Sequence, residues 1–256
     1  MKTIKIKVAL GIILTALCIL SACKQKITEP VTIGHLAYDQ YERFGYTVYI
    51  KEIEGYKPYL VLTNEYNGNT LLLRKHVLPK LHVFNPMSSY GPINNYYETS
   101  EIDSFINNEY KETLDETIQK KIVPSTIVIG EKYKGYAKQS DTIEIVRDIF
   151  LLSVTEIGYK SASSYIEGKV LKYFKIVENR LAAYESGEKE NWWLRTASTY
   201  SSDAGSAYHS SEMVLGGGGG AVYYENGVRP AFCLNNDEPI TLRDDIIPGE
   251  MVYVLE

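Results

Sequence analysis

Cysteine and histidine are scarce in this sequence, and their positions exclude several kinds of site. Of the three cysteines, Cys18 and Cys23 lie within or directly after an N-terminal apolar run, so Cys233 alone belongs to the body of the chain and cannot form an intramolecular disulfide there. Cys233 lies in the alternating run Ala231–Leu234, and we interpret it as a buried core thiol. No two histidines have metal-ligand spacing and no Cys pair exists, so we expect neither a metal centre nor a cofactor. The four histidines are His35, His76, His82 and His209.

A second long apolar run is also missing, so one N-terminal segment carries all the targeting information that we can identify. Three lysines (Lys2, Lys5 and Lys7) precede the apolar run Val8 to Leu20, which is too short for a comfortable membrane span. The run ends in Leu20-Ser21-Ala22-Cys23, which resembles the lipobox of bacterial lipoproteins. The resemblance implies a signal peptide over residues 1–22 and a palmitate-type lipid on Cys23 that anchors the chain to the outer face of the cell membrane, or to the outer membrane in a two-membrane host.

Basic residues are outnumbered by acidic ones, which argues against polyanionic partners. The formal net charge is −5, and removing residues 1–22 with their three lysines and no acid takes it to −8. Binding to nucleic acid requires a basic face that neutralises phosphates. We therefore expect no nucleic-acid partner.

The remaining residues predict a tether followed by one domain. Residues 23–44 comprise the lipidated cysteine and a short polar tether, with disorder expected over residues 24–37, and residues 45–256 form a single α+β domain. Strands are predicted at Tyr46–Ile50 and Tyr59–Thr63, and Asn67-Gly68 predicts a hairpin into Leu71–Leu73. Further strands are predicted over residues 127–130, 145–152 and 221–224, and an edge strand over residues 251–255.

Two capping boxes predict where helices begin. Ser100 to Asp103 starts an apolar stripe of helical period that reaches Ile122, although the paired Asn107 and Asn108 leave open whether this is one helix or two. Ser153 to Glu156 predicts a second helix, and a third helical face lies over residues 171–181.

The segment from Trp192 to Leu234 is the most unusual part of the sequence. Two apolar runs, which we interpret as buried strands, enclose a long Ser/Gly-rich loop. Each run contains one arginine, and because a buried arginine must be paired, we interpret both as structural clamps, with contact to a ligand as the alternative. The proposed structural signature comprises Trp192, Trp193, Arg195, Arg229 and Pro230.

The chemistry that the loop could carry is limited. The glycine run Gly216–Gly220 lacks the Gly-Lys-Ser/Thr and helix start of a phosphate loop, and no Gly-x-Ser-x-Gly motif occurs. A weak calcium site at Asp203, Glu212 and Glu225 is the alternative to ordinary surface charge. Nothing in the sequence selects a catalytic pair of carboxylates, so we name no catalytic residue.

Taken in order, the motifs resemble an uncharacterised bacterial family of secreted and lipid-anchored domains. They are Leu71–Arg74, Glu98-Thr99-Ser100 with its helix, Phe150–Ser153, and the Trp-Trp-Leu-Arg and Val-Arg-Pro-Ala runs. More remotely, the order of elements is similar to the C-type-lectin-like fold shared with formylglycine-generating enzymes, which implies a mixed sheet with two or three helices. The lectin disulfides and calcium motifs and the catalytic Cys pair of those enzymes are absent from the sequence.

These observations favour a non-catalytic binding module for a glycan, cell-wall or protein ligand. Polar and aromatic residues on a rigid sheet resemble the composition of antibody paratopes. The candidate binding residues are Tyr200, Asp203, Tyr208, His209, Glu212, Tyr223 and Tyr224. The alternatives are an extracellular hydrolase acting on glycan or peptide and a structural envelope component without a ligand.

Overall fold

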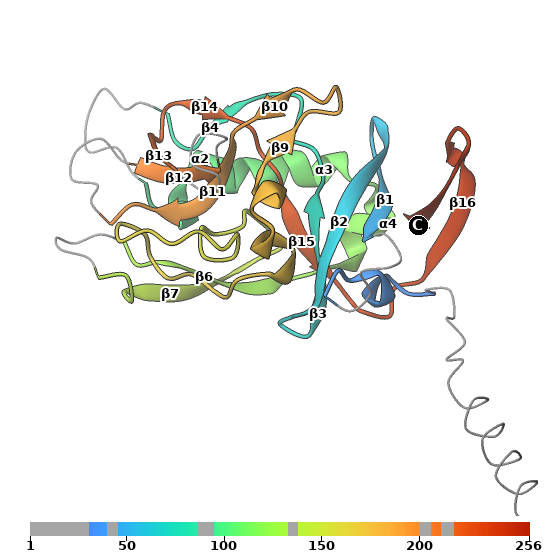
Figure 1. Cartoon of the computed structure of the whole chain (residues 1–256), viewed down its shortest axis with the longest axis horizontal. Helices are drawn as coiled ribbons and strands as arrows, with labels where there is room; N and C mark the ends of the chain where they lie inside the picture. The colour runs from blue at the N-terminus through green and yellow to red at the C-terminus, as the bar shows by residue number, and fades with distance from the viewer. Residues whose placement is uncertain (1–30, 40–45, 87–94, 133–137, 200–205, 211–217) are drawn as a thin grey trace, which may run out of the picture.

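A computed structural model describes residues 31–39, 46–86, 95–132, 138–199, 206–210 and 218–256, with the side chains of residues 206–219 left undescribed. The chain combines β-sheets with a few short helices, which confirms the α+β class (Figure 1). The C-type-lectin-like arrangement stays a prediction.

The central element is a mixed eight-stranded sheet. Its order is β16-β17-β1-β2-β3-β15-β5, and β8 pairs with β15 beside β5. The pairing of β1 with β17 is parallel, and the other pairs are antiparallel. The strands are β1 (Thr47–Glu52), β2 (Gly55–Tyr66), β3 (Asn69–Arg74), β5 (Ile122–Val123), β8 (Ile149–Phe150), β15 (Ala231–Leu234), β16 (Ile240–Ile247) and β17 (Glu250–Leu255).

The β2–β3 hairpin turns at Asn67-Gly68, as predicted. Both residues have positive φ, 52° and 80°, and Tyr66 pairs with Asn69 across them. Such a turn follows the twist of the flanking strands, which is why Asn-Gly favours it. The hairpin brings Leu60 to Leu62 and Leu71 to Leu73 into the core, where each buried leucine contributes about 1.5–3 kcal/mol.

The stripe over residues 100–122 forms two helical pieces and not one. Ser100 caps the first, its Oγ accepting a hydrogen bond from Asp103 N at 3.1 Å. A π-helical turn then interrupts the helix at the two asparagines, and the chain becomes extended at Leu114. Asp115 caps the second piece. The first piece comprises α2 (Glu101–Phe105), the π-helical turn η3 (Ile106–Tyr110) and α3 (Lys111–Thr113), and it follows the 3₁₀ turn η2 (Tyr97–Thr99). The second piece is α4 (Glu116–Lys121).

The second predicted helix is wrong, although its capping box forms. Ser153 N donates to Glu156 Oε2 at 2.9 Å, and Glu156 N donates to Ser153 Oγ at 3.0 Å. After one turn, Gly158 at φ 74° reverses the chain, with Tyr159 N bonding to Val154 O. This is the glycine C-terminal motif of a helix. The third predicted face consists of two 3₁₀ turns, η4 (Lys172–Lys175) and η5 (Val177–Arg180).

Smaller sheets lie on the side of the molecule away from β1 and β16 (Figure 1). The stretch predicted as one buried strand over residues 145–152 contributes the end of β7 and the separate strand β8. The region predicted as a long loop contains two strands that join β11 in a three-stranded sheet, and the strand predicted over residues 221–224 ends at Ala221. The pairs are β6 (Ser125–Gly130) with β7 (Thr142–Arg147), β9 (Ala182–Ala183) with β10 (Lys189–Glu190), and β4 (His82–Val83) with β14 (Glu225–Asn226); the three-stranded sheet is β11 (Trp192–Ala197), β12 (Ser206–Ser210) and β13 (Gly218–Ala221).

Two expectations about the ends of the chain need correction. Disorder over residues 24–37 is wrong for its described part, because the 3₁₀ turn η1 (Ile33–Leu36) buries Ile33 and Leu36 in the core. The strand over residues 251–255 exists as β17, but it lies between β16 and β1 and is not an edge. Within the described ranges, none of the helices has the length and apolar character needed to span a membrane.

Candidate functional site around three buried arginines

The proposed signature residues lie in the interior. Every residue of β11 is buried, and the indole Nε1 atoms of Trp192 and Trp193 donate to Arg180 O at 2.9 Å and His82 O at 2.8 Å. The ring of Phe84 meets Trp193 edge-on at 5.6 Å. Pro230 is buried as well, and its carbonyl accepts a hydrogen bond from Arg74 N at 3.0 Å. The signature residues therefore connect β11 to β4 and the 3₁₀ turn η5, and the residue before β15 to β3.

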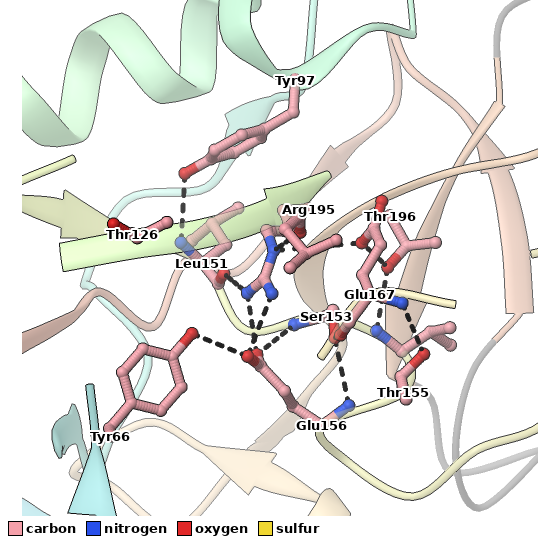
Figure 2. Close-up of polar contacts among 12 residues, drawn as sticks. Tyr66, Tyr97, Thr126, Leu151, Ser153, Thr155, Glu156, Glu167, Arg195 and Thr196 are labelled. Carbon is pink, nitrogen blue, oxygen red and sulfur yellow. Dashed lines mark hydrogen bonds and ion pairs between the residues drawn. The ribbon is translucent and has the colours of Figure 1, made fainter. Parts of the chain in front are cut away.

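Arg195 makes the contacts that a structural clamp requires. Its Nε donates to Val128 O at 3.0 Å, and Nη1 donates to Leu151 O at 2.8 Å. Two further bonds reach the carboxylate of Glu156, Nη1 to Oε2 at 2.7 Å and Nη2 to Oε1 at 3.0 Å (Figure 2). Such a bidentate pair fixes the relative position of both groups.

Glu156 also accepts hydrogen bonds from a distant strand and from its own turn. Its Oε1 accepts from the Tyr66 hydroxyl at 2.8 Å, and its Oε2 accepts from Ser153 N. Burial, followed by the charge of Glu156, raises the pKa of Tyr66 well above its ordinary value, so Tyr66 remains a donor. The network therefore joins β2, the turn after β8, and β11.

A second carboxylate, Glu167, lies on the opposite side of the same guanidinium. Its Oε1 accepts from Gly130 N at 2.7 Å, its Oε2 accepts from Thr196 Oγ1 at 2.6 Å, and Oε2 is 3.9 Å from Arg195 Nε. Burial raises the pKa of Glu167 to about 7, against the opposing effect of Arg195. One guanidinium thus faces two carboxylates, and protonation of Glu167 makes the cluster electrically neutral.

This carboxylate pair does not have the arrangement that the hydrolase alternative requires. Both side chains are about 1 % exposed, and each of their oxygens accepts a hydrogen bond from the protein. A glycosidase pair flanks a cleft that admits substrate and water. In the described part of the chain, an open depression of about 130 Å³ lies elsewhere, lined by Leu181, Ala182, Lys189, Glu190 and Asn191.

Arg74 is a third buried arginine, which we did not single out from the sequence. Its Nε and Nη2 donate to the Glu52 carboxylate at 2.9 and 3.3 Å, and its Nη1 donates to the carbonyls of His76 and Val77. The hydroxyl of Tyr59 also donates to Glu52, at 2.6 Å. The sequence contained the signal that could have identified it, a lone arginine in an apolar run. Arg74 ends such a run, and Arg195 and Arg229 interrupt two others.

Arg229 differs from the other two buried arginines. Its guanidinium lies 4.8 Å from the Trp192 ring centre, and its Nε donates to Arg74 O at 3.0 Å. No carboxylate among the described residues pairs with it, and the buried Nη1 has no hydrogen-bond partner there. Burial lowers the pKa of Arg229 to about 10, which still leaves it charged at neutral pH.

Cys233 is a core thiol, as predicted. It is fully buried in β15, and burial raises the pKa of its thiol to about 12. Almost no thiolate exists at neutral pH under these conditions, so Cys233 is not an activated nucleophile.

The candidate binding residues fall into three groups. Tyr200, Asp203 and Glu212 lie outside the described residues, and Tyr208 and His209 are placed in β12 by their backbone. Tyr223 is half-buried and Tyr224 is 58 % exposed, with their rings edge-to-face at 5.0 Å, and the neighbouring Glu225 is exposed. Over the described ranges, no group of three or more His, Cys, Asp or Glu side chains is arranged to hold a metal ion.

Comparison with known proteins identifies a family whose function is unknown. No curated protein and no solved structure matches the chain significantly. Residues 67–236, well over half of the chain, match a domain of unknown function, DUF6273. The match includes β3, the buried arginines and β15, whereas β1, β16 and β17 lie outside it. The resemblance to an uncharacterised domain family is thereby confirmed, and the chain belongs to the DUF6273 family.

Proposed function

We propose that the chain is an exported lipoprotein whose domain binds a glycan, cell-wall or protein ligand without catalysing a reaction. The supporting observation is the Tyr223–Tyr224 pair. It follows Val222, which is fully buried and whose carbonyl accepts hydrogen bonds from Phe84 N at 2.8 Å and Asn85 N at 2.9 Å. Two adjacent tyrosines on a fixed turn offer apolar area and hydroxyl groups at little cost in conformational entropy.

The backbone of two further candidate residues lies in the three-stranded sheet that leads into this tyrosine pair. β13 leads directly into Val222, and β12 pairs with both β13 and the fully buried β11. Tyr208 and His209 belong to β12, so the backbone of these candidate residues is built on the signature strand. Adaptable polar residues on a rigid sheet are the usual composition of a recognition surface. The C-type-lectin-like relationship, the bacterial origin and the signature role of Trp192, Trp193, Arg195, Arg229 and Pro230 form part of this proposal.

The surface is tested by replacing one exposed tyrosine. We expect Tyr224→Ser to weaken binding to insoluble peptidoglycan, or to the glycan identified by an array screen, roughly tenfold or more, because aromatic anchors dominate such interfaces. The measurement is a co-sedimentation isotherm. The matched control is Tyr49→Ser, since Tyr49 is a half-buried tyrosine on β1, which lies at the other end of the molecule from β14 (Figure 1). Equal loss in both variants, or unchanged binding in Tyr224→Ser, contradicts the proposed surface.

The anchor is tested at the cysteine itself. We expect Cys23→Ser to abolish incorporation of a labelled fatty acid and to release the chain from the membrane fraction, because two acyl chains on one thiol-linked group provide the membrane affinity. The assay compares lipid labelling and fractionation of the two chains. Cys233→Ser is the control, since that thiol is buried and should leave labelling unchanged. Labelling that persists in Cys23→Ser would falsify the anchor.

A further inference from the structure

We propose that Arg229 is a receptor for the carboxylate group of a small ligand. This inference is independent of the Tyr223–Tyr224 surface, because it rests on a different group and is measured by a different experiment.

The first argument is the comparison of Arg229 with its two counterparts. Arg74 and Arg195 are equally enclosed, and each is paired with a glutamate through two or more hydrogen bonds and with backbone carbonyls. Arg229 is 2 % exposed, yet among the described residues it donates a single hydrogen bond, to a backbone carbonyl. A buried cation without a counter-ion is costly, and each unsatisfied buried group in a native structure requires an explanation.

The second argument is the chemistry around the group. Trp192 covers one face of the guanidinium, which leaves the edge with Nη1 to make planar hydrogen bonds. The positive charge of Arg74 also acts on Arg229, and an anion at the Nη1 edge would offset it. A carboxylate matches the guanidinium edge in shape and charge, and it is the group that pairs with Arg74 and Arg195 in this same protein.

Tyr173 and His76 are the two side chains other than Arg74 that carry an electrostatic interaction with Arg229 in the described part of the chain. The hydroxyl-bearing ring of Tyr173 interacts with the charge of Arg229 and is largely buried. His76 is half-buried, and its pKa is lowered by burial and then by the positive charges of Lys75 and Arg229.

A carboxylate could belong to an acidic sugar or to the C-terminus of a peptide, and both are used as probes. Thermal unfolding of the whole chain is measured with sodium glucuronate and with N-acetyl-Ala-Ala, each against its neutral counterpart, glucose or the peptide amide, at equal ionic strength. A ligand at about 100 times its Kd should raise the Tm by about 5–10 °C for a chain of this size. The probe that raises the Tm identifies the source of the carboxylate.

The variants make the assignment specific to Arg229. Arg229→Met should abolish the carboxylate-dependent shift, whereas Arg243→Met should retain it, because Arg243 lies at the surface and is already paired with Asp245 and Glu256. Without ligand, Arg229→Met should unfold at the same Tm as the parent or higher, since it removes an unpaired charge.

One measurement requires no variant. In the parent chain, the Nε–H resonance of Arg229 should shift on adding the active probe. The absence of any Tm shift and resonance shift with both carboxylates overturns the proposal, and so does a Tm shift that persists in Arg229→Met.

Discussion

Replacing Arg195 with Met is expected to destabilise the fold by about 3–5 kcal/mol, the usual cost of removing one partner of a buried ion pair. The side chain lengths are similar, so little of this cost comes from a cavity. The loss arises because Glu156 and Glu167 stay buried without their shared cation, and the carbonyls of Val128 and Leu151 lose their donors. Urea unfolding followed by tryptophan fluorescence measures the change, since Trp192 and Trp193 adjoin Arg195 in β11.

Arg243→Met is the matched control for this experiment. Arg243 also has two carboxylate partners, with Asp245 and Glu256 each 2.6 Å away, but it lies at the surface. Solvent screens such pairs, so the urea midpoint should hardly change. Comparable destabilisation by the two substitutions would show that enclosure of the Arg195 network is not what stabilises the fold.

The contribution of Glu167 to the free energy of unfolding is expected to fall as the pH rises from about 4.5 to about 7. Burial raises the pKa of Glu167 from 4.5 in the unfolded chain to about 7 in the fold. The folded state therefore binds more protons in this window, and its stability contribution is complete below pH 4.5 and lost as the pH passes 7. The expected amplitude is about 1–3 kcal/mol.

Glu167→Gln should remove this pH dependence, because Gln is the neutral isostere of the protonated acid. The quantity to compare is the slope of the unfolding free energy between pH 4.5 and 7 in the two chains. Asp103→Asn is the informative second variant, since burial also raises the pKa of Asp103, to about 6, but Asp103 pairs with Arg147 outside the cluster. Asp103→Asn should reduce the slope of the unfolding free energy against pH only below about pH 6. If Glu167→Gln has the same slope as the parent chain, Glu167 is not the group that binds the proton.

Local signals in the sequence predicted local structure well. Asn67-Gly68 and the Ser100 cap each depend on residues no more than a few positions apart, and both form as expected. The same reasoning failed at Ser153 to Glu156 for a physical reason. The capping hydrogen bonds are made, but Glu156 also binds Arg195 and Tyr66, and Gly158 ends the helix after one turn. A local glycine and the tertiary contacts of Glu156 together limit this segment to one turn.

The candidate site was predictable only in part. The two arginines stood out as lone charges in apolar runs, yet their partners come from remote segments: Glu156 and Glu167 lie 39 positions and 28 positions before Arg195. No periodic pattern connects such residues. β16 was missed because its sequence, Ile-Thr-Leu-Arg-Asp-Asp-Ile-Ile, carries charges that are typical of an edge strand and rare in a core strand.

The parallel pairing of β1 with β17 has a consequence for the timing of folding. Val48 lies beside Tyr253, so the sheet joins residues from nearly opposite ends of the sequence. Contacts of such large sequence separation form late, because the intervening chain must be ordered or at least brought together first. While the chain is still emerging from the ribosome or a translocation channel, β1 has only β2 as a partner, and its other edge stays open.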